Sequence, residues 1–187
     1  LARDGGLYLP AEIPVMTQDE FAALEGLPYE EIAFRVMWPY VSGSFGEGEF
    51  KEIIARAYEG FGHDARAPLK ELNGNHFLLE LFHGPTLAFK DFAMQLISQL
   101  FQVALKRRGD RVTIVGATSG DTGSAAIEAF RGLDAVDVFI LFPHGRVSEV
   151  QRRQMTTPAD SNVHALAVDG DFDDCQAALK DMFNDFD

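Results

Sequence analysis

The sequence predicts an α/β fold: a mostly parallel sheet with flanking helices, preceded by a small, mainly helical segment. From residue 75 onward, strand-length apolar runs alternate with segments of helical spacing, a pattern typical of strands joined by crossover helices. These runs are apolar throughout, as expected for a sheet that is covered on both faces. Before residue 75, frequent glycine and proline residues leave room only for short helices. We therefore expect a helical segment over residues 1–74 and an α/β portion over residues 75–187.

The first segment contains two stretches that predict helices. Thr17 is followed three residues later by Glu20, which is the spacing of a capping box, and apolar residues continue the pattern. Residues 48–58 place apolar side chains at helical spacing. Turn-forming residues lie between the two stretches, so separate short helices are expected.

The second portion alternates between strands, turns and helices. Its first long helix is expected to end before Gly109, because glycine readily terminates a helix. Ligands of such sheets bind beyond the carboxyl ends of the strands, which makes the loops after the strands the candidate sites. The predicted elements are strands at 77–82, 111–117 and 137–142, helices at 89–107 and 124–130, and candidate loops at 83–90, 118–123 and 144–148.

Composition narrows the possible functions. The 187 residues include 16 lysines and arginines against 29 aspartates and glutamates, a net charge of −13. A surface of this sign repels nucleic acid and anionic membranes, so we expect neither as a partner. No apolar run approaches the roughly 20 residues of a membrane-spanning helix. The single cysteine, Cys175, cannot form an internal disulfide, which favours a cytoplasmic location.

Both ends of the sequence look cut. It begins at Leu1 rather than at methionine, and it stops at Asp187 within a pattern of helical spacing. We therefore expect this sequence to be part of a longer chain, which leaves room for a removed leader peptide.

Lys90 is the strongest candidate for a catalytic residue. It stands at the start of a predicted helix, where the helix dipole disfavours a cation, and among Leu87, Phe89 and Phe92. Apolar surroundings favour the neutral amine, which can form a Schiff base or accept a proton from carbon. A solvated lysine at a helix start is the alternative, and it is the usual state of a lysine.

The polar, glycine-rich turn at residues 118–123 is the second candidate site. It joins a buried strand to a helix, where small residues expose backbone N–H groups that could bind a carboxylate or a phosphate. A tight turn in which Asp121 or Thr122 merely caps the helix is the alternative. The turn lacks the Gly-Lys-Ser/Thr ending of a Walker loop. Its glycine spacing and the lack of a ribose-binding acid after the next strand argue against a dinucleotide site.

The sequence does not predict a metal site. The acidic run at residues 169–174 departs from the calcium-loop pattern, because Asp174 stands where the sharp turn needs glycine and Lys180 where a glutamate ligand is needed. Carboxylates at the start of the following helix explain the run better. The five histidines lack the paired spacing of a zinc site.

Taken together, the two candidate loops resemble those of the threonine synthase family. Residues 83–95, His-Gly-Pro-Thr-Leu-Ala-Phe-Lys-Asp-Phe-Ala-Met-Gln, are similar to the family's segment around the lysine that binds pyridoxal phosphate. Residues 116–126 resemble its substrate loop. Residues 3–10 and 162–183 also resemble family segments, so the likeness covers nearly the whole chain.

The resemblance implies the tryptophan synthase β-like fold, with pyridoxal 5′-phosphate as cofactor. It implies that Lys90 forms the Schiff base, that Phe89 packs against the cofactor ring and that Asp121 lies near the phenolic oxygen of the cofactor. The substrate would be O-phospho-L-homoserine, which reacts with water to give L-threonine and phosphate. The groups for the cofactor phosphate and the pyridine nitrogen would lie in C-terminal sequence that is absent here. The substrate would be held by Thr118, Ser119, Gly120, Asp121, Thr122 and Gly123.

Arg146 is the candidate cation for the substrate phosphate. A net charge of −13 would slow the approach of an anionic substrate unless local cations line the entrance. Arg146 follows the strand at 137–142 and so opens on the same sheet edge as the other two loops. An ordinary surface arginine at a helix start is the alternative.

Other functions stay open at this point. Related serine/threonine dehydratases and cysteine synthases tend to have serine before the Phe-Lys pair, a basic residue after it and asparagine in place of Asp121, so Ala88, Phe92 and Asp121 favour threonine synthase. An NAD(P)-binding oxidoreductase would need a ribose-binding acid, which the sequence lacks. A noncatalytic binding domain would leave the apolar setting of Lys90 unexplained. No oligomeric state is predicted.

Overall fold

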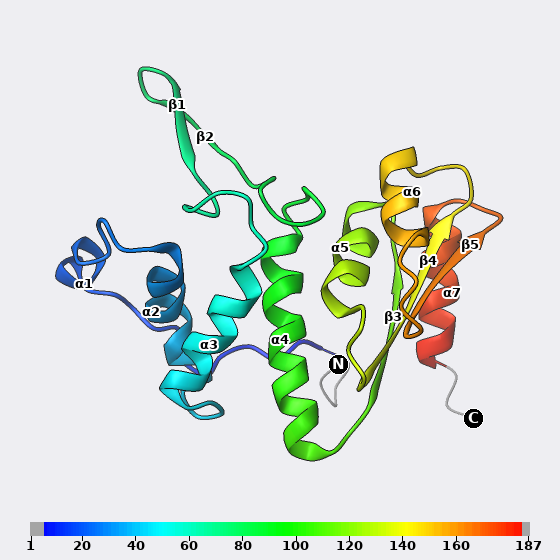
Figure 1. Cartoon of the computed structure of the whole chain (residues 1–187), viewed down its shortest axis with the longest axis horizontal. Helices are drawn as coiled ribbons and strands as arrows, with labels where there is room; N and C mark the ends of the chain where they lie inside the picture. The colour runs from blue at the N-terminus through cyan, green and yellow to red at the C-terminus, as the bar shows by residue number, and fades with distance from the viewer. Residues whose placement is uncertain (1–5, 185–187) are drawn as a thin grey trace. The chain divides into compact units, whose positions relative to one another are not determined.

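The computed structural model describes residues 6–184, which form two units (Figure 1). One unit is Leu1–Ala55 and the other is Arg56–Asp187. Residues 1–5 and 185–187 lie outside the described part, and with them the start of the segment at 3–10 that carries part of the family resemblance.

The first unit is helical, as the sequence predicts. It contains α1 (Gln18–Ala22), α2 (Tyr29–Val41) and most of α3 (Glu47–Tyr58), whose last residues belong to the second unit. The capping box predicted for the first helix is confirmed, because Thr17 and Glu20 cap each other's backbone N–H. The core of this unit contains Phe34 and Phe50, whose ring centroids are 6.2 Å apart.

The second unit begins with an exposed hairpin that the sequence analysis missed. Strands β1 (Leu69–Asn73) and β2 (His76–Leu79) pair with each other in antiparallel orientation, and all of their residues are exposed. The strand expected at 77–82 is therefore wrong in its length and partner, because it does not join the parallel sheet. Gly74 adopts a φ of +50°, which permits the tight turn after Asn73.

The expected boundary between residues 74 and 75 falls in the turn of this hairpin. The contacts instead divide the chain after Ala55. A division of the chain by function into a helical segment and a cofactor-binding portion stays a prediction.

A three-stranded parallel sheet forms the centre of the second unit. Its strands are β3 (Val112–Ala117), β4 (Val136–Pro143) and β5 (Val163–Val168), in the order β3-β4-β5. The sheet therefore confirms the predicted strands at 111–117 and 137–142. The helices of this unit are α4 (Asp91–Arg108), α5 (Asp121–Phe130), α6 (Glu149–Thr156) and α7 (Phe172–Asn184).

Helices cover both faces of this sheet, as predicted. Successive residues of β4 point to opposite faces, and one of these faces packs against α5 and α6. Helix α7 packs against β3 and β4, and Figure 1 shows it across the sheet from α4 and α5. The core between β4, α5 and α6 consists of Ala126, Ile127, Ala129, Phe130, Val136, Val138, Ile140, Phe142 and Met155.

The helix ends follow the capping signals of the sequence. Helix α4 ends at Gly109, which is left-handed with a φ of 68° and donates its N–H to the Leu105 carbonyl at 2.8 Å. The acidic run before α7 caps that helix, because Asp171 Oδ1 accepts the N–H groups of Asp173 and Asp174. Helix-start carboxylates therefore explain this run.

Two further findings concern the described residues only. Within residues 6–184, no helix combines the length and the apolar character that crossing a membrane requires. The same residues bring no three His, Cys, Asp or Glu side chains into an arrangement that could hold a metal ion.

Candidate active site

Lys90 occupies the N-cap position of α4, next to the ring of Phe89. Its side chain is partly exposed, its Nζ lies 4.7 Å from the Phe89 ring centroid, and it forms no hydrogen bond to the helix end. No residue of the described part forms an ion pair with it. The apolar enclosure expected for Lys90 is only partly present, because Leu87 is 67% exposed and Phe89 is 53% exposed.

A buried carboxylate holds the turn that carries Lys90. Asp91 is 0% exposed, and its two oxygens accept the Thr86 N–H at 2.8 Å and the Thr86 hydroxyl at 2.6 Å. Gly84 lies so close to Asp91 that a Cβ on the glycine would come within 2.5 Å of the aspartate side chain. Leu87 has a φ of +64°, a left-handed conformation that costs a non-glycine residue about 1–2 kcal/mol. The turn is therefore fixed from within by Asp91.

Sequence reasoning missed Asp91. An acid in the first turn of a helix is common, and it normally signals only a favourable interaction with the helix dipole. The spacing of five residues between Thr86 and Asp91 is a weak signal, and only the folded turn shows that the two side chains meet.

Thr118 shapes the loop at 118–123 from inside. The residue is 2% exposed, and its hydroxyl oxygen accepts the N–H of Gly120 at 3.0 Å and of Gly123 at 2.9 Å. Gly120 has a φ of +146°, and a Cβ on Gly123 would come within 2.8 Å of Ile140. Both glycines are therefore required by the close packing of the loop.

The loop leaves three backbone donors available at the start of α5. The N–H groups of Ser119, Asp121 and Thr122 donate to no residue within 6–184. Ser119 and Asp121 are exposed and Thr122 is partly exposed. Donors at a helix N-terminus attract anions, since the helix dipole adds to their partial charges.

The predicted site residues come together at one edge of the sheet. Strands β3 and β4 are parallel, so the loops that follow them open at the same edge, and Thr118 N–H donates to the Leu141 carbonyl at 2.9 Å. Helices α4 and α5 pack beside each other, and both begin at this end of the sheet (Figure 1). The structure thus brings together the loops of Lys90 and Asp121, while Arg146 lies exposed in the loop after β4.

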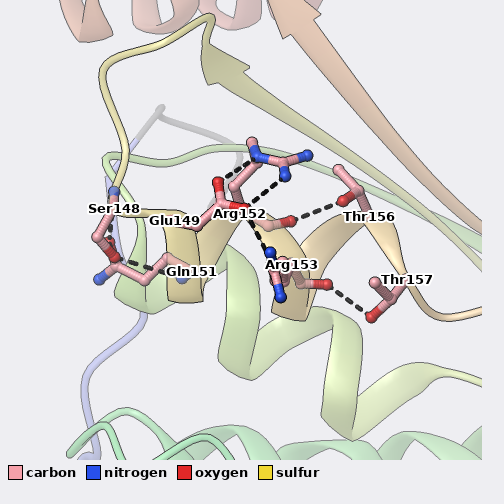
Figure 2. A network of polar contacts seen from close by, with 7 residues as sticks. All are labelled: Ser148, Glu149, Gln151, Arg152, Arg153, Thr156 and Thr157. Carbon is pink, nitrogen blue, oxygen red and sulfur yellow. Dashed lines mark hydrogen bonds and ion pairs between the residues drawn. The ribbon is translucent and has the colours of Figure 1, made fainter.

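Helix α6 presents a charged outer face beside this edge (Figure 2). Glu149 accepts hydrogen bonds from the side chains of Arg152 and Arg153 at 2.8 Å. These hydrogen bonds lower the pKa of Glu149 to about 2, and the bond from Arg152 has a larger effect than that from Arg153. Since both arginines are already paired, Arg146 is the better candidate for an incoming anion, and its guanidinium contacts no acid within the described residues.

A cavity of this unit lies away from these loops. Its volume is about 700 Å³, and it opens beside Gly109 and Val136, at the amino ends of β3 and β4. It is therefore at the opposite edge of the sheet from Lys90 and the loop at 118–123.

Comparisons with known proteins match the whole chain. Residues 1–58 match the family model described as threonine synthase N terminus, and residues 63–187 match the model described as pyridoxal-phosphate dependent enzyme. The chain is 60% identical over 185 residues to a threonine synthase of Pseudomonas aeruginosa, covering 99% of this chain and 39% of that protein. It thus spans about two fifths of the length of the relatives that it matches.

Solved structures agree with this match. A threonine synthase from Brucella melitensis, described as bound to PLP, superposes with a TM-score of 0.92 at 56% identity, over 98% of this chain and 40% of that one. A threonine synthase from Escherichia coli has a TM-score of 0.83 at 35% identity, over 100% of this chain and 42% of that one. With its lysine turn, its glycine-rich loop and the match over residues 63–187, the chain belongs to the pyridoxal-phosphate dependent enzyme family.

Proposed function

We propose that the full-length protein containing this chain is a threonine synthase, which converts O-phospho-L-homoserine and water into L-threonine and phosphate. The observation that carries the proposal is the position of Lys90, which has no acidic partner within residues 6–184 and shares a sheet edge with a loop of open N–H donors. The similarity to threonine synthases over 99% of the chain supports the same assignment.

The residues at this edge fit pyridoxal 5′-phosphate. An amine that is not held in an ion pair with a carboxylate can form a Schiff base, and the exposed ring of Phe89 beside Lys90 offers a surface for a flat heterocycle. When bound, pyridoxal phosphate supplies an electron sink for carbanion chemistry. In this proposal Lys90 holds the cofactor, Phe89 packs against its ring and Asp121 lies near its phenolic oxygen.

The other residues of the site bind and orient the substrate. The N–H groups of Ser119, Asp121 and Thr122 receive the substrate carboxylate, and Gly120 and Gly123 allow the close approach of the backbone. Thr118, whose hydroxyl is taken up within the loop, holds these donors in place.

In this proposal Lys90 also transfers protons of the substrate. With substrate bound, the Lys90 amine would move a proton at the α carbon and at the β carbon of the substrate. In the overall reaction the bond between the γ carbon and the phosphate oxygen breaks, and the γ carbon gains the proton that the β carbon loses. The hydroxyl of water bonds to the β carbon, and the other proton of water goes to the released phosphate. Arg146 attracts the phosphate end of the substrate to this edge.

The alternatives find less support. A dehydratase of the same family would use the same cofactor, but the similarity to threonine synthases extends over residues 1–58 as well. The loop at 118–123 lacks the features of a dinucleotide site, so an oxidoreductase is not favoured. A cytoplasmic location, in keeping with the single cysteine, and the absence of nucleic-acid partners stay predictions.

The activity of the full-length protein tests the proposal. Phosphate release and threonine formation from O-phospho-L-homoserine are expected, together with the visible absorbance of a lysine Schiff base. Deamination of serine or threonine without phosphate release would instead identify a dehydratase.

Replacing Ser119 with alanine is expected to weaken substrate binding. In this proposal the hydroxyl of the exposed Ser119 donates to the same carboxylate as the open N–H groups, so the loss of this hydrogen bond should raise the apparent KM roughly twofold to tenfold. Steady-state kinetics of the full-length enzyme measure this effect, and Ser161→Ala, an exposed serine before β5, serves as the control. Unchanged kinetics combined with a loss of several kcal/mol of stability would show that Ser119 only shapes the turn.

Replacing Arg146 with methionine is expected to weaken inhibition by free phosphate. An exposed charge contributes up to about 1 kcal/mol, so the inhibition constant should rise roughly twofold to fivefold, and the difference should shrink as salt screens the charge. Arg108→Met removes one charge at the far end of α4 and controls for net charge. Unchanged inhibition in the Arg146 variant would assign phosphate binding to other residues.

A further inference from the structure

We propose that helix α6 sets the spacing between the two loops of this active site through Gln151 and Gln154. The inference rests on the proposed function for its kinetic consequences, but the contacts themselves belong to the chain alone. Gln151 and Gln154 are three residues apart in a helix and therefore lie on neighbouring positions of one face. Each reaches a different loop, and neither touches the reacting atoms, so both are positioning residues.

Gln151 holds the loop at 118–123. Its Nε2 donates to Asp121 Oδ1 at 2.6 Å, while its Oε1 accepts the Ser148 hydroxyl at 2.8 Å (Figure 2 shows the Ser148 bond). The side-chain amide also lies flat against Gly120, where a Cβ would come within 2.4 Å of it. The amide is thus fixed at both ends, and it fixes Asp121 in turn.

Gln154 holds the loop that carries Lys90. Its Nε2 donates to the Thr86 carbonyl at 3.1 Å, across 68 positions of sequence. Thr86 is the same residue whose N–H and hydroxyl are bound by Asp91. The N–H and the hydroxyl of Thr86 are thus hydrogen-bonded within the turn, and its carbonyl is hydrogen-bonded to α6.

Helix α6 is well anchored for this task. Met155, the neighbour of Gln154, is 1% exposed in the core, and its Sδ would lie 3.0 Å from a Cβ on Gly123. The opposite face is exposed, and its pairs of Glu149 with Arg152 and Arg153 lie within the helix itself (Figure 2). A helix anchored in the core through Met155 can transmit its own position to the loops that its glutamines bind.

The spacing matters because catalysis depends on geometry. Lys90 must reach the same substrate whose carboxylate the loop at 118–123 binds, and a misplacement of about 1 Å can cost roughly 100-fold in rate. Asp121 and Lys90 belong to separate elements, so a shared support keeps their relative position constant while substrate enters and leaves.

The experiment uses the full-length protein with Gln151→Met, Gln154→Met and the matched control Arg153→Met, which changes the outer face of the same helix. Hydrogen exchange without cofactor is the first readout. We expect the Thr86 amide to exchange roughly threefold to tenfold faster in the Gln154 variant, and the Gly120 and Gly123 amides to do so in the Gln151 variant. The Arg153 variant should match the wild type.

Kinetics and the circular dichroism of the cofactor band provide the second readout. The Gln154 variant should lose about tenfold or more in kcat with little change in KM, because it displaces Lys90. The Gln151 variant should mainly raise KM, because it loosens the carboxylate loop. The visible dichroism should change in the Gln154 variant without loss of the absorbance band.

The outcomes separate this inference from the proposed function. The inference about α6 would be overturned if the Thr86, Gly120 and Gly123 amides exchanged at wild-type rates in both glutamine variants. A general loss of stability with unchanged kinetics of the folded enzyme would overturn it as well. A wild-type protein without a visible band or turnover would refute the proposed function, while the exchange pattern would still decide whether α6 holds the two loops.

Discussion

Lys90→Ala in the full-length protein is expected to lose the visible absorbance of the Schiff base and about 10³-fold or more of its turnover. In the proposed function the lysine amine both holds the cofactor and moves the protons, and no neighbouring amine in the described turn can replace it. The fold should remain intact, because the side chain is partly exposed and forms no hydrogen bond to the helix end. Absorbance spectra, turnover and thermal unfolding measure the three quantities.

Borohydride reduction followed by peptide mass spectrometry locates the modified lysine directly. Lys106→Ala is the matched control, since Lys106 lies in the last turn of the same helix. That variant should keep both absorbance and turnover. Recovery of the reduced adduct on Lys106, or on any lysine other than Lys90, would contradict the assignment.

Asp91→Ala is expected to produce the largest loss of stability among single changes at the site. The substitution leaves the N–H and the hydroxyl of Thr86 without their acceptor in a buried position. Losing hydrogen bonds to a charged group costs about 1.5–3 kcal/mol, and the unsatisfied donors add to this, so we expect a loss of roughly 2–4 kcal/mol. Urea unfolding of the full-length protein measures it.

The same variant should also impair the Schiff base, because Asp91 fixes the turn that carries Lys90. Asp110→Ala is the control: this aspartate, 48% exposed, pairs with Arg108 at the surface, where such a pair contributes at most about 1 kcal/mol. An Asp91 variant with an unchanged urea midpoint and a normal absorbance band would show that the turn holds itself without the carboxylate.

Local patterns account for most of the elements that the sequence predicts correctly. The capping box of Thr17 and Glu20 and the helix end at Gly109 each involve residues within about one helical turn of each other. The local sequence therefore contains all the groups that form them. The apolar runs of β3 and β4 are local patterns too, and they predict a parallel sheet covered on both faces because such strands are apolar along their whole length. The rule for parallel strands places the loops after β3 and β4 at one edge. Lys90 reaches the same edge through the start of α4, which packs beside α5 and does not follow a strand of this sheet.

The hairpin of β1 and β2 shows where this reasoning fails. Residues 77–82 are apolar enough for a buried strand, but the Asn73-Gly74 pair just before them forms the turn of a hairpin. Apolar character alone does not distinguish a strand of the central sheet from an exposed hairpin, because the choice of partner depends on the surrounding chain.

The sequence by itself determined the parallel strands β3 and β4 with the helices α4 and α5, the identity of the candidate lysine and the loop that offers backbone donors. Each of these depends on residues that are close along the chain. Only the tertiary structure decided how those pieces are held: Thr118 turned inward, Asp91 buried against Thr86, and Gln151 and Gln154 linked to the two loops. Hydrogen bonds between residues 30 and 68 positions apart have no local signature in the sequence. A glutamine amide can hydrogen-bond to many kinds of partner, and only the folded chain brings one of them within reach.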